Sequence, residues 1–345
     1  MRASLIEGFF VCPACRAPGL RVVPLEEGAG GLRNAVITCP SCRQWYRLED
    51  GVLEMLMPGL RDERRARSFA GRFRSRWDGW NAAGATPAVE PPPPDAHKLG
   101  QKSFFDDEAI RYETQMVRLP FWRAFDATYV AAVGEGARDG GALVELGGGT
   151  GRMSLPILDR FSLVLSFDIS ETMVRRGVQN CDAQGPRAAH VHFFVADAEN
   201  IPLQDGVADV ASLSGILHHV SAPDRVLREA ARVLKPGGRV IGNENNRSVM
   251  RFLFDRLMKV SELWREKAHH EHFIIHTDEL QGWLRGAGLE ARTWTSVFLP
   301  PHLFNVLGST RALSFLRGTD ALAHAVPWVR GQGGLVLYSG AKRAA

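Results

Sequence analysis

The chain has 345 residues, of which 45% are hydrophobic and 23% charged, as in folded globular proteins rather than disordered or fibrous ones. This length exceeds what one α/β domain needs, so we expect such a domain with smaller parts attached. The net charge of +4 indicates neither a nucleic-acid nor a membrane partner by itself. The first residues form only a short apolar run, and no window approaches the roughly 18 apolar residues of a membrane span. We therefore expect a cytoplasmic protein with no membrane span, and the oligomeric state stays open.

Four of the five cysteines form two Cys-x-x-Cys pairs near the start of the chain, Cys12 with Cys15 and Cys39 with Cys42. Two such turns direct four thiolates at one ion, the closed cage that structural Zn²⁺ prefers. A catalytic zinc would need an open ligand position, and a redox pair would need a thioredoxin-like βαβ context. We therefore predict a small zinc-ribbon domain over residues 1–57.

The end of this segment adds a resemblance. Residues 43–56, RQWYRLEDGVLEML, resemble the end of the small zinc-ribbon subunits that activate certain RNA and protein methyltransferases.

A basic segment follows, with seven arginines between residues 61 and 76. Phe69, Phe73 and Trp77 are spaced four apart, which predicts an amphipathic helix with a weak point at Gly71. Its arginines either contact RNA phosphates or form a solvated face. Trp77, together with Trp80, could instead pack over an active site.

Residues 81–94 include four consecutive prolines, which favour extended chain and predict a linker. The basic helix and this linker together make up residues 58–100.

From residue 141 apolar runs alternate with helical patterns, which predicts βαβ units and a parallel sheet. Residues 142–152, ALVELGGGTGR, read as a strand, a glycine-rich turn and the opening of a helix, where backbone can approach a ligand closely. Arg152 stands where the dinucleotide fingerprint requires a third glycine, which disfavours a nicotinamide cofactor.

This segment resembles motif I of class I S-adenosylmethionine-dependent methyltransferases with a type-11-like core. The resemblance implies a Rossmann-like, doubly wound α/β fold with a seven-stranded sheet over residues 101–345, and S-adenosylmethionine as cofactor.

The next predicted strands follow in the order that this family has. Residues 162–170 end near Asp168, placed to accept the ribose hydroxyls, and residues 188–203 carry Asp197 and Ala198, which lie beside adenine in the family. Residues 209–220 border the methyl group in the family. The implied cofactor-binding residues are Glu145, Gly147, Gly148, Gly149, Gly151, Asp168, Ile169, Asp197, Ala198 and Ser214.

The C-terminal part fits the same family. Residues 277–288 predict a helix with Thr277 as its N-cap, and residues 289–299 and 333–343 supply the last two strands, the final one antiparallel. Residues 246–276 form an insertion whose apolar helix either lids the substrate or packs into the core.

Methyl transfer needs donor and acceptor held in line, and a base where the acceptor must lose a proton. The catalytic candidates are His218 and His219, in the loop after the fourth strand, and His272, in a histidine-rich cluster at residues 269–276. Packing roles for the first two, and metal binding by the cluster, are alternatives.

The sequence favours a small-molecule acceptor methylated on oxygen, nitrogen or carbon, because the insertion is apolar and residues 68–77 resemble a segment of bacterial small-molecule methyltransferases. The DNA amino-methyltransferase signature is absent after the fourth strand, and no pair of catalytic cysteines occurs in the core. An RNA base methyltransferase that uses the ribbon and the arginines for RNA binding is the alternative. A non-catalytic, cofactor-binding regulator is a third class.

Overall fold

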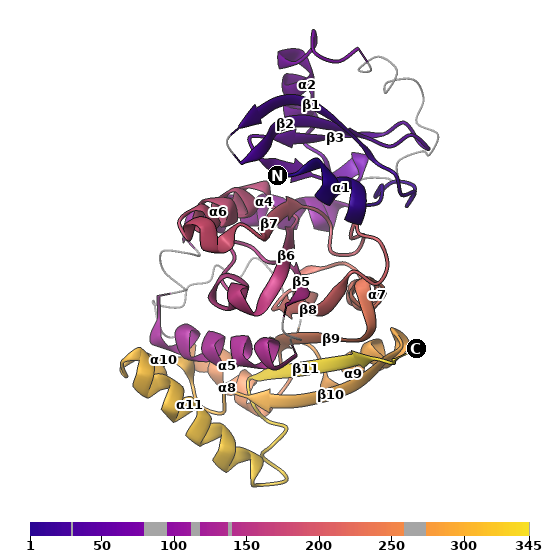
Figure 1. Ribbon diagram of the computed structural model, residues 1–345. Helices are drawn as coiled ribbons and strands as arrows, with labels where there is room; N and C mark the ends of the chain where they lie inside the picture. Colours follow the sequence, from indigo (N-terminus) through magenta and orange to yellow (C-terminus); the bar gives the residue numbers. More distant parts are fainter. Residues whose placement is uncertain (29, 79–94, 112–117, 137–139, 259–273, 345) are drawn as a thin grey trace.

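The computed structural model describes residues 1–28, 30–78, 95–111, 118–136, 140–258 and 274–344 (Figure 1). Trp80, the proline-rich stretch and His272 therefore lie outside the described residues. Within the described part, no helix is both long and apolar enough to cross a bilayer.

The core is a seven-stranded sheet in the order β7-β6-β5-β8-β9-β11-β10. Its strands are β5 (Gly141–Leu146), β6 (Phe161–Asp168), β7 (Val191–Val195), β8 (Ala208–Ser214), β9 (Leu234–Asn245), β10 (Leu289–Ser296) and β11 (Leu335–Lys342). Strands β5 to β9 pair in parallel, and β11 runs antiparallel to both β9 and β10. The predicted doubly wound, seven-stranded α/β sheet is confirmed.

Four N-terminal strands extend this sheet to eleven (Figure 1). After α1 (Ala3–Phe9) come β1 (Arg21–Gly28), β2 (Gly31–Thr38), β3 (Trp45–Glu49) and β4 (Val52–Glu54). Strand β4 pairs in parallel with β7, Leu53 opposite Phe194 and Glu54 opposite Val195. The cysteine-containing segment and the core therefore share one continuous sheet, a connection that the sequence did not predict.

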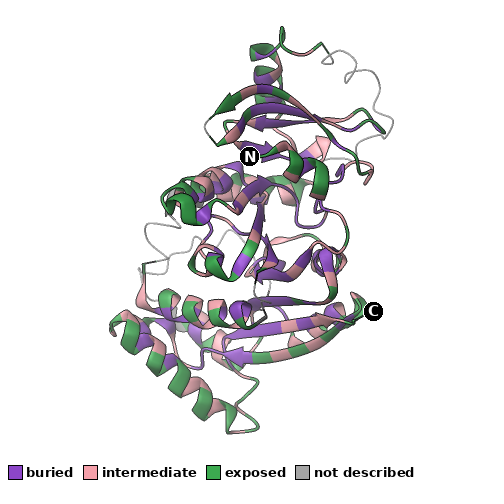
Figure 2. Ribbon diagram, viewed as in Figure 1, coloured by how far each residue is buried: buried purple, intermediate pink, exposed green. Residues whose placement is uncertain are grey.

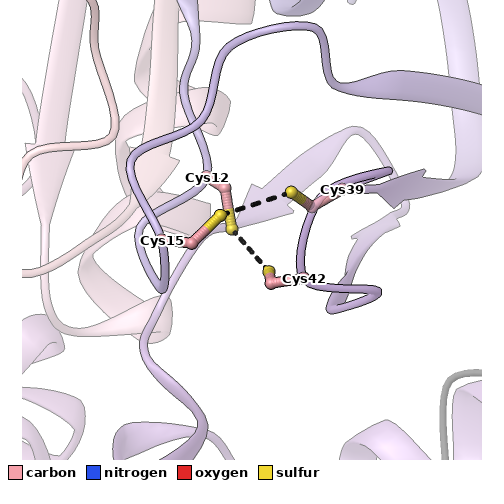
Figure 3. Close-up of side chains that lie close together, drawn as sticks. All are labelled: Cys12, Cys15, Cys39 and Cys42. Carbon is pink, nitrogen blue, oxygen red and sulfur yellow. Dashed lines mark hydrogen bonds between the residues drawn. The ribbon is translucent and has the colours of Figure 1, made fainter. Parts of the chain in front are cut away.

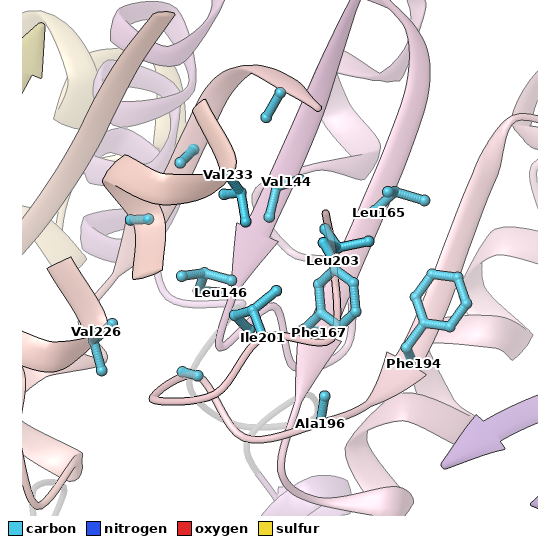
Figure 4. Close-up of a cluster of buried hydrophobic side chains, with 14 of the residues drawn as sticks. Val144, Leu146, Leu165, Phe167, Phe194, Ala196, Ile201, Leu203, Val226 and Val233 are labelled. Atoms are coloured by element: carbon cyan, nitrogen blue, oxygen red, sulfur yellow. The ribbon is translucent and has the colours of Figure 1, made fainter. Parts of the chain in front are cut away.

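Helices cover both faces of the core sheet. One face packs α5 (Pro120–Gly136), α6 (Glu171–Asp182) and α11 (Ser309–His324) onto side chains such as Leu143. The other packs α7 (Pro223–Val233) and α9 (Thr277–Gly286) onto side chains such as Val144 and Leu146 (Figure 4). Consecutive residues of β5 thus point to opposite faces, so both faces of the strand are buried (Figure 2).

The remaining helices are α2 (Glu63–Arg72), α4 (Ala96–Arg111), α8 (Val249–Met258) and α10 (Pro301–Asn305), with the short 3-10 helices η1 (Pro58–Leu60), η3 (Leu155–Arg160), η4 (Gly185–Ala188) and η5 (Leu217–His219). Helix α2 confirms the predicted basic helix in a shorter form. It begins after Asp62, whose carboxylate caps two backbone N–H groups, and it ends at Arg72, directly after Gly71, with Phe73 as its C-cap.

Two local predictions were wrong. The glycine-rich turn does not open directly into an α-helix but leads through further turns to η3, where Pro156 removes a backbone donor. His276 rather than Thr277 is the N-cap of α9, since the Thr277 hydroxyl lies 3.4 Å from the side-chain oxygen of Asn246.

Candidate functional site

The glycine-rich turn after β5 is shaped so that only backbone fits there. Gly147 has a φ of 68°, and a Cβ atom on it would lie 2.7 Å from Cδ1 of Ile216. A Cβ atom on Gly148 would overlap the hydroxyl of Ser166. Neighbouring atoms exclude a side chain at both positions, and at Gly147 the backbone conformation disfavours one as well. The turn therefore forms a cradle that a ligand can approach closely.

Two carboxyl groups flank this cradle. The Asp168 carboxylate, at the end of β6, accepts hydrogen bonds from the N–H groups of Gly149 at 3.0 Å and Ser170 at 2.9 Å. Burial raises its pKa to about 6, and the nearby charge of Asp106 adds to the rise. Glu145 is buried at the end of β5, and burial raises its pKa to about 7. Neither carboxyl group has a basic side chain at hydrogen-bonding distance among the described residues.

A third acidic group follows β7 and is bound to a lysine. The Lys98 ammonium, from α4, lies 2.7 Å from Oδ2 of Asp197 and 2.8 Å from Oε2 of Glu199. Burial alone would lower the pKa of Lys98, but the two carboxylates reverse this and raise it. The ion pairs hold α4 against the loop that follows β7.

Helix α4 forms part of the wall of a cavity at the carboxyl ends of the strands. Lys98, Gln101 and Phe105 line this cavity, three and four residues apart and therefore on one helical face. The side-chain oxygen Oε1 of Gln101 is buried and has no hydrogen-bond partner among the described residues. Sequence reasoning assigned residues up to 100 to a linker and missed this helix, although the same spacing is present in the printed sequence.

The cavity collects most of the predicted cofactor residues. Its lining includes Glu145, Gly147, Gly148, Gly149, Asp168, Ile169, Asp197, Ala198 and Ser214. Gly151 lines a neighbouring groove instead, between α5, η3 and α6. None of the described residues in 246–276 lines the cavity, so the described part of the predicted lid does not border it.

One of the two adjacent histidines faces the cavity. His219 lines it, whereas Nδ1 of His218 lies 2.6 Å from Oε2 of Glu244. The two imidazole rings are tilted by 43° with their centroids 3.9 Å apart, and Phe105 meets the His219 ring edge to face. Glu244 also accepts a hydrogen bond from the Leu217 N–H at 2.7 Å, and burial raises its pKa to about 8. The contacts form a continuous path from Glu244 through both rings to the cavity.

The four N-terminal cysteines converge in space, with their sulfur atoms within 4.8 Å of one another. Figure 3 shows the two closest pairs, Cys12 with Cys42 and Cys15 with Cys39, each 3.5 Å apart. A tetrahedral Zn²⁺ with Zn–S bonds of about 2.3 Å places its sulfurs about 3.8 Å apart. The donor set therefore fits a zinc ion, and the Tyr46 hydroxyl lies 3.0 Å from Sγ of Cys12.

The first cysteine turn also contacts the core. The Asn200 side chain donates to the carbonyl of Pro13 at 2.9 Å, and Arg16 reaches the carbonyl of Ile201 and the carboxylate of Glu229, both at 2.7 Å. Asn200 and Ile201 continue the loop that carries Asp197.

The basic segment packs on the N-terminal strands and also forms an ion pair with α6 of the core. Arg65 pairs with Glu171 at 2.6 Å and Arg72 with Glu49 at 2.7 Å. The Trp77 ring meets the Trp45 ring edge on, and Trp77 packs against the small apolar cluster of Leu25, Val36, Phe69 and Phe73. Trp77 is not among the cavity residues, so the idea that it covers an active site was wrong.

Comparison with known families and sequences gives a consistent result. A family described as "Methyltransferase domain" matches residues 144–242. The ubiquinone/menaquinone biosynthesis C-methyltransferase UbiE of Vibrio cholerae serotype O1 is 30% identical over 177 residues, which are 46% of this chain and 68% of the relative. The enzyme of the same name from Acidiphilium cryptum is 39% identical over 146 residues, 41% of this chain and 57% of the relative. The chain thus spans between about half and about two thirds of these relatives' length.

Solved structures share the fold. Geranyl diphosphate C-methyltransferase from Streptomyces coelicolor A3(2) superposes with a TM-score of 0.52 and 14% identity, covering 73% of this chain and all of that one. A chain from the complex of the Haloferax volcanii Trm112 methyltransferase activator gives a TM-score of 0.50 and 19% identity, covering 69% of this chain and 97% of that one. At these identities the likeness concerns the fold alone.

Proposed function

We propose that this chain, which belongs to the family of S-adenosylmethionine-dependent methyltransferases, transfers the methyl group of S-adenosylmethionine to a small-molecule acceptor. The observation that carries the proposal is the cavity at the ends of β5, β6, β7 and β8, where the glycine cradle and the Asp168 carboxylate meet. Ligands of open α/β sheets bind at this edge.

The residues around the cavity suit a nucleoside with a sulfonium group. Asp168 would accept the ribose hydroxyls, and the backbone of Gly147 to Gly149 would lie against the amino-acid part. Ala198 and Asp197 would border the adenine ring, and the orphaned Oε1 of Gln101 offers a buried acceptor for a donor on the ligand. When bound, S-adenosylmethionine supplies an electrophilic methyl group.

For the acceptor we propose a small apolar molecule methylated at carbon, because the sequence relatives are C-methyltransferases of ubiquinone and menaquinone biosynthesis. An aromatic carbon that gains a methyl group must lose its proton. His219 lines the cavity and would take that proton, while His218 and Glu244 would hold its ring in place. His272 stays a further candidate, outside the described residues.

We also propose that Cys12, Cys15, Cys39 and Cys42 hold one structural Zn²⁺. Four thiolates leave no open coordination position, so the ion would support the fold of the ribbon and not the reaction.

Calorimetry with S-adenosylhomocysteine tests the cofactor site. We expect Asp168→Ala and Gly149→Val each to weaken binding at least about tenfold. The first removes a charged hydrogen-bond acceptor, whose bond contributes about 1.5–3 kcal/mol. The second places a β-branched residue at a φ of 53°. Asp159→Ala is the matched control, because Asp159 is exposed and pairs with Arg187 away from the cavity. Unchanged affinity in both site variants would overturn the assignment.

Methyl transfer from radiolabelled S-adenosylmethionine tests the acceptor, with hydroquinones and bulk RNA offered in parallel. Label in hydroquinone, lost in His219→Ala while S-adenosylhomocysteine still binds, supports the proposal. Label in RNA would favour the alternative; of the arginines that it would use, Arg65 and Arg72 already pair with carboxylates of the protein. Binding without transfer to any acceptor would favour a regulator.

A further inference from the structure

Large apolar side chains are exposed mainly at one end of the molecule. Ten are exposed among the described residues, and eight of these lie in α8, α10, α11 or the turns that follow α10 and α11. These eight are Val249, Phe252, Leu253, Leu303, Val306, Phe315, Leu322 and Trp328. We call them, with the arginines between them, the α8–α11 surface. Contiguous exposed apolar surface on a folded domain indicates an interaction site.

Helix α11 carries this surface on its outer side. Helices α10 and α11 are inserted between β10 and β11, at the end of the molecule opposite the N-terminal strands (Figure 1). Ala312 and Leu316 are buried toward the core. Phe315 and Leu322, seven residues apart, lie on one stripe that faces outward, and Leu322 is 74% exposed. Apolar side chains therefore occur on the outward face of α11 as well as on its buried face.

The turn after α11 and the start of α8 continue the surface. Trp328 is 81% exposed in this turn. The Val249 N–H donates to the side chain of Gln332 at 3.1 Å, and Phe254 of α8 packs near Gly334. Elements far apart in the sequence therefore meet at this end of the molecule.

The charges around the apolar residues are positive. Arg311, Arg317 and Arg330 are exposed in the segment from α10 to the turn. The acidic residues of these elements are engaged: Asp320 accepts from the Ser296 hydroxyl and the Val297 N–H, and Asp255 pairs with Arg251 at 2.8 Å. The described residues of these elements thus combine exposed apolar side chains and arginines with no exposed carboxylate, which complements the acyl chains and anionic headgroups of a lipid surface.

We propose that the α8–α11 surface docks on anionic lipid bilayers, with Leu322 and Trp328 inserted at the headgroup boundary and Arg311 and Arg330 on lipid phosphates. The chain would then lie on a membrane without crossing it. This docking does not depend on which acceptor the cavity takes.

Co-sedimentation of the full chain with vesicles tests the proposal, using phosphatidylcholine alone or with about one third phosphatidylglycerol. We expect binding to the anionic vesicles that weakens with salt. Leu322→Ser combined with Trp328→Ala should lower the partition at least about tenfold, because each side chain gives up apolar burial. Trp294→Ala is the matched control, since Trp294 is exposed on β10 outside this surface, and its partition should be unchanged. Arg311→Glu should lower binding to anionic vesicles without touching the apolar residues.

The opposing results are distinct. Absence of vesicle binding at low salt, or an equal loss in Trp294→Ala, overturns the proposal. A concentration-dependent dimer by light scattering that disappears in the double variant would instead assign the surface to a second copy of the chain. Retained S-adenosylhomocysteine binding shows that each variant is folded. If the unaltered chain does not bind S-adenosylhomocysteine, that result counts against the proposed function and not against lipid docking.

Discussion

Arg47 is a buried cation that joins the N-terminal strands to one another and to α6 of the core. It is 2% exposed and lies 2.8 Å from Glu54 on β4 and 2.5 Å from both Glu49 on β3 and Glu171 on α6. Arg47→Met keeps most of the volume of the side chain and removes its charge. The change leaves the carboxylate of Glu54, itself 3% exposed, without its cation.

The expected cost follows from these contacts. Removing one partner of a buried ion pair costs about 3–5 kcal/mol, since the remaining charge stays buried. Glu171 keeps its ion pairs with Arg65 and Arg175, both 2.6 Å away. Glu54 is therefore the carboxylate that the loss of Arg47 destabilises most. Burial already raises the pKa of Glu54, and protonation would limit the penalty. We therefore expect Arg47→Met to lower the free energy of unfolding by about 3 kcal/mol, at the lower end of that range.

Urea unfolding followed by tryptophan fluorescence measures this loss. Arg33→Met is the matched control, because Arg33 and Asp50 form an exposed pair, with 63% and 45% of their side chains exposed, and should cost less than about 1 kcal/mol. Adding Glu54→Gln to Arg47→Met should recover part of the loss, because the orphaned carboxylate is removed. A loss for Arg47→Met no larger than that of the control would refute the reasoning.

Three further predictions concern the cavity, the cysteines and pH. Gly148→Ala should abolish S-adenosylhomocysteine binding by calorimetry, because a Cβ atom there overlaps the Ser166 hydroxyl. Gly308→Ala is the control, since a Cβ atom on Gly308 meets no atom within 4 Å. An equal loss of binding in both variants would contradict a role of the glycine-rich turn in binding the cofactor. Cys39→Ser should remove bound zinc by atomic absorption and lower the melting temperature, whereas a zinc content unchanged from the unaltered chain would contradict the ligand set. Burial raises the pKa of Glu244 to about 8, so the folded state binds its proton more tightly than the unfolded state. The free energy of unfolding should therefore fall as pH rises from about 4.5 to about 8, and the fall should be smaller in Glu244→Gln; an identical fall would count against a buried, proton-binding Glu244.

The order of the core strands could be predicted because their patterns are local. The apolar run before Gly147, the acid at the end of the next strand and the turns between them are all readable within short windows. The two cysteine pairs are equally local, and the structure brings their sulfurs within 4.8 Å. Helix details were less accurate, as at Thr277, because capping depends on which neighbour a hydroxyl meets.

The sequence by itself therefore determined the fold class, the glycine cradle and the set of strand-end acids, since periodicity and turn chemistry act between near neighbours. Only the tertiary structure decided that β4 pairs with β7, that Lys98 of α4 forms an ion pair with Asp197, and that Glu244 lies at hydrogen-bonding distance from His218. Each of these joins residues many positions apart, and no local pattern reports such a contact. Packing also decided which arginines of the basic segment pair with carboxylates, as Arg65 and Arg72 do. A run of arginines has the same sequence pattern whether or not a carboxylate lies opposite it in the fold.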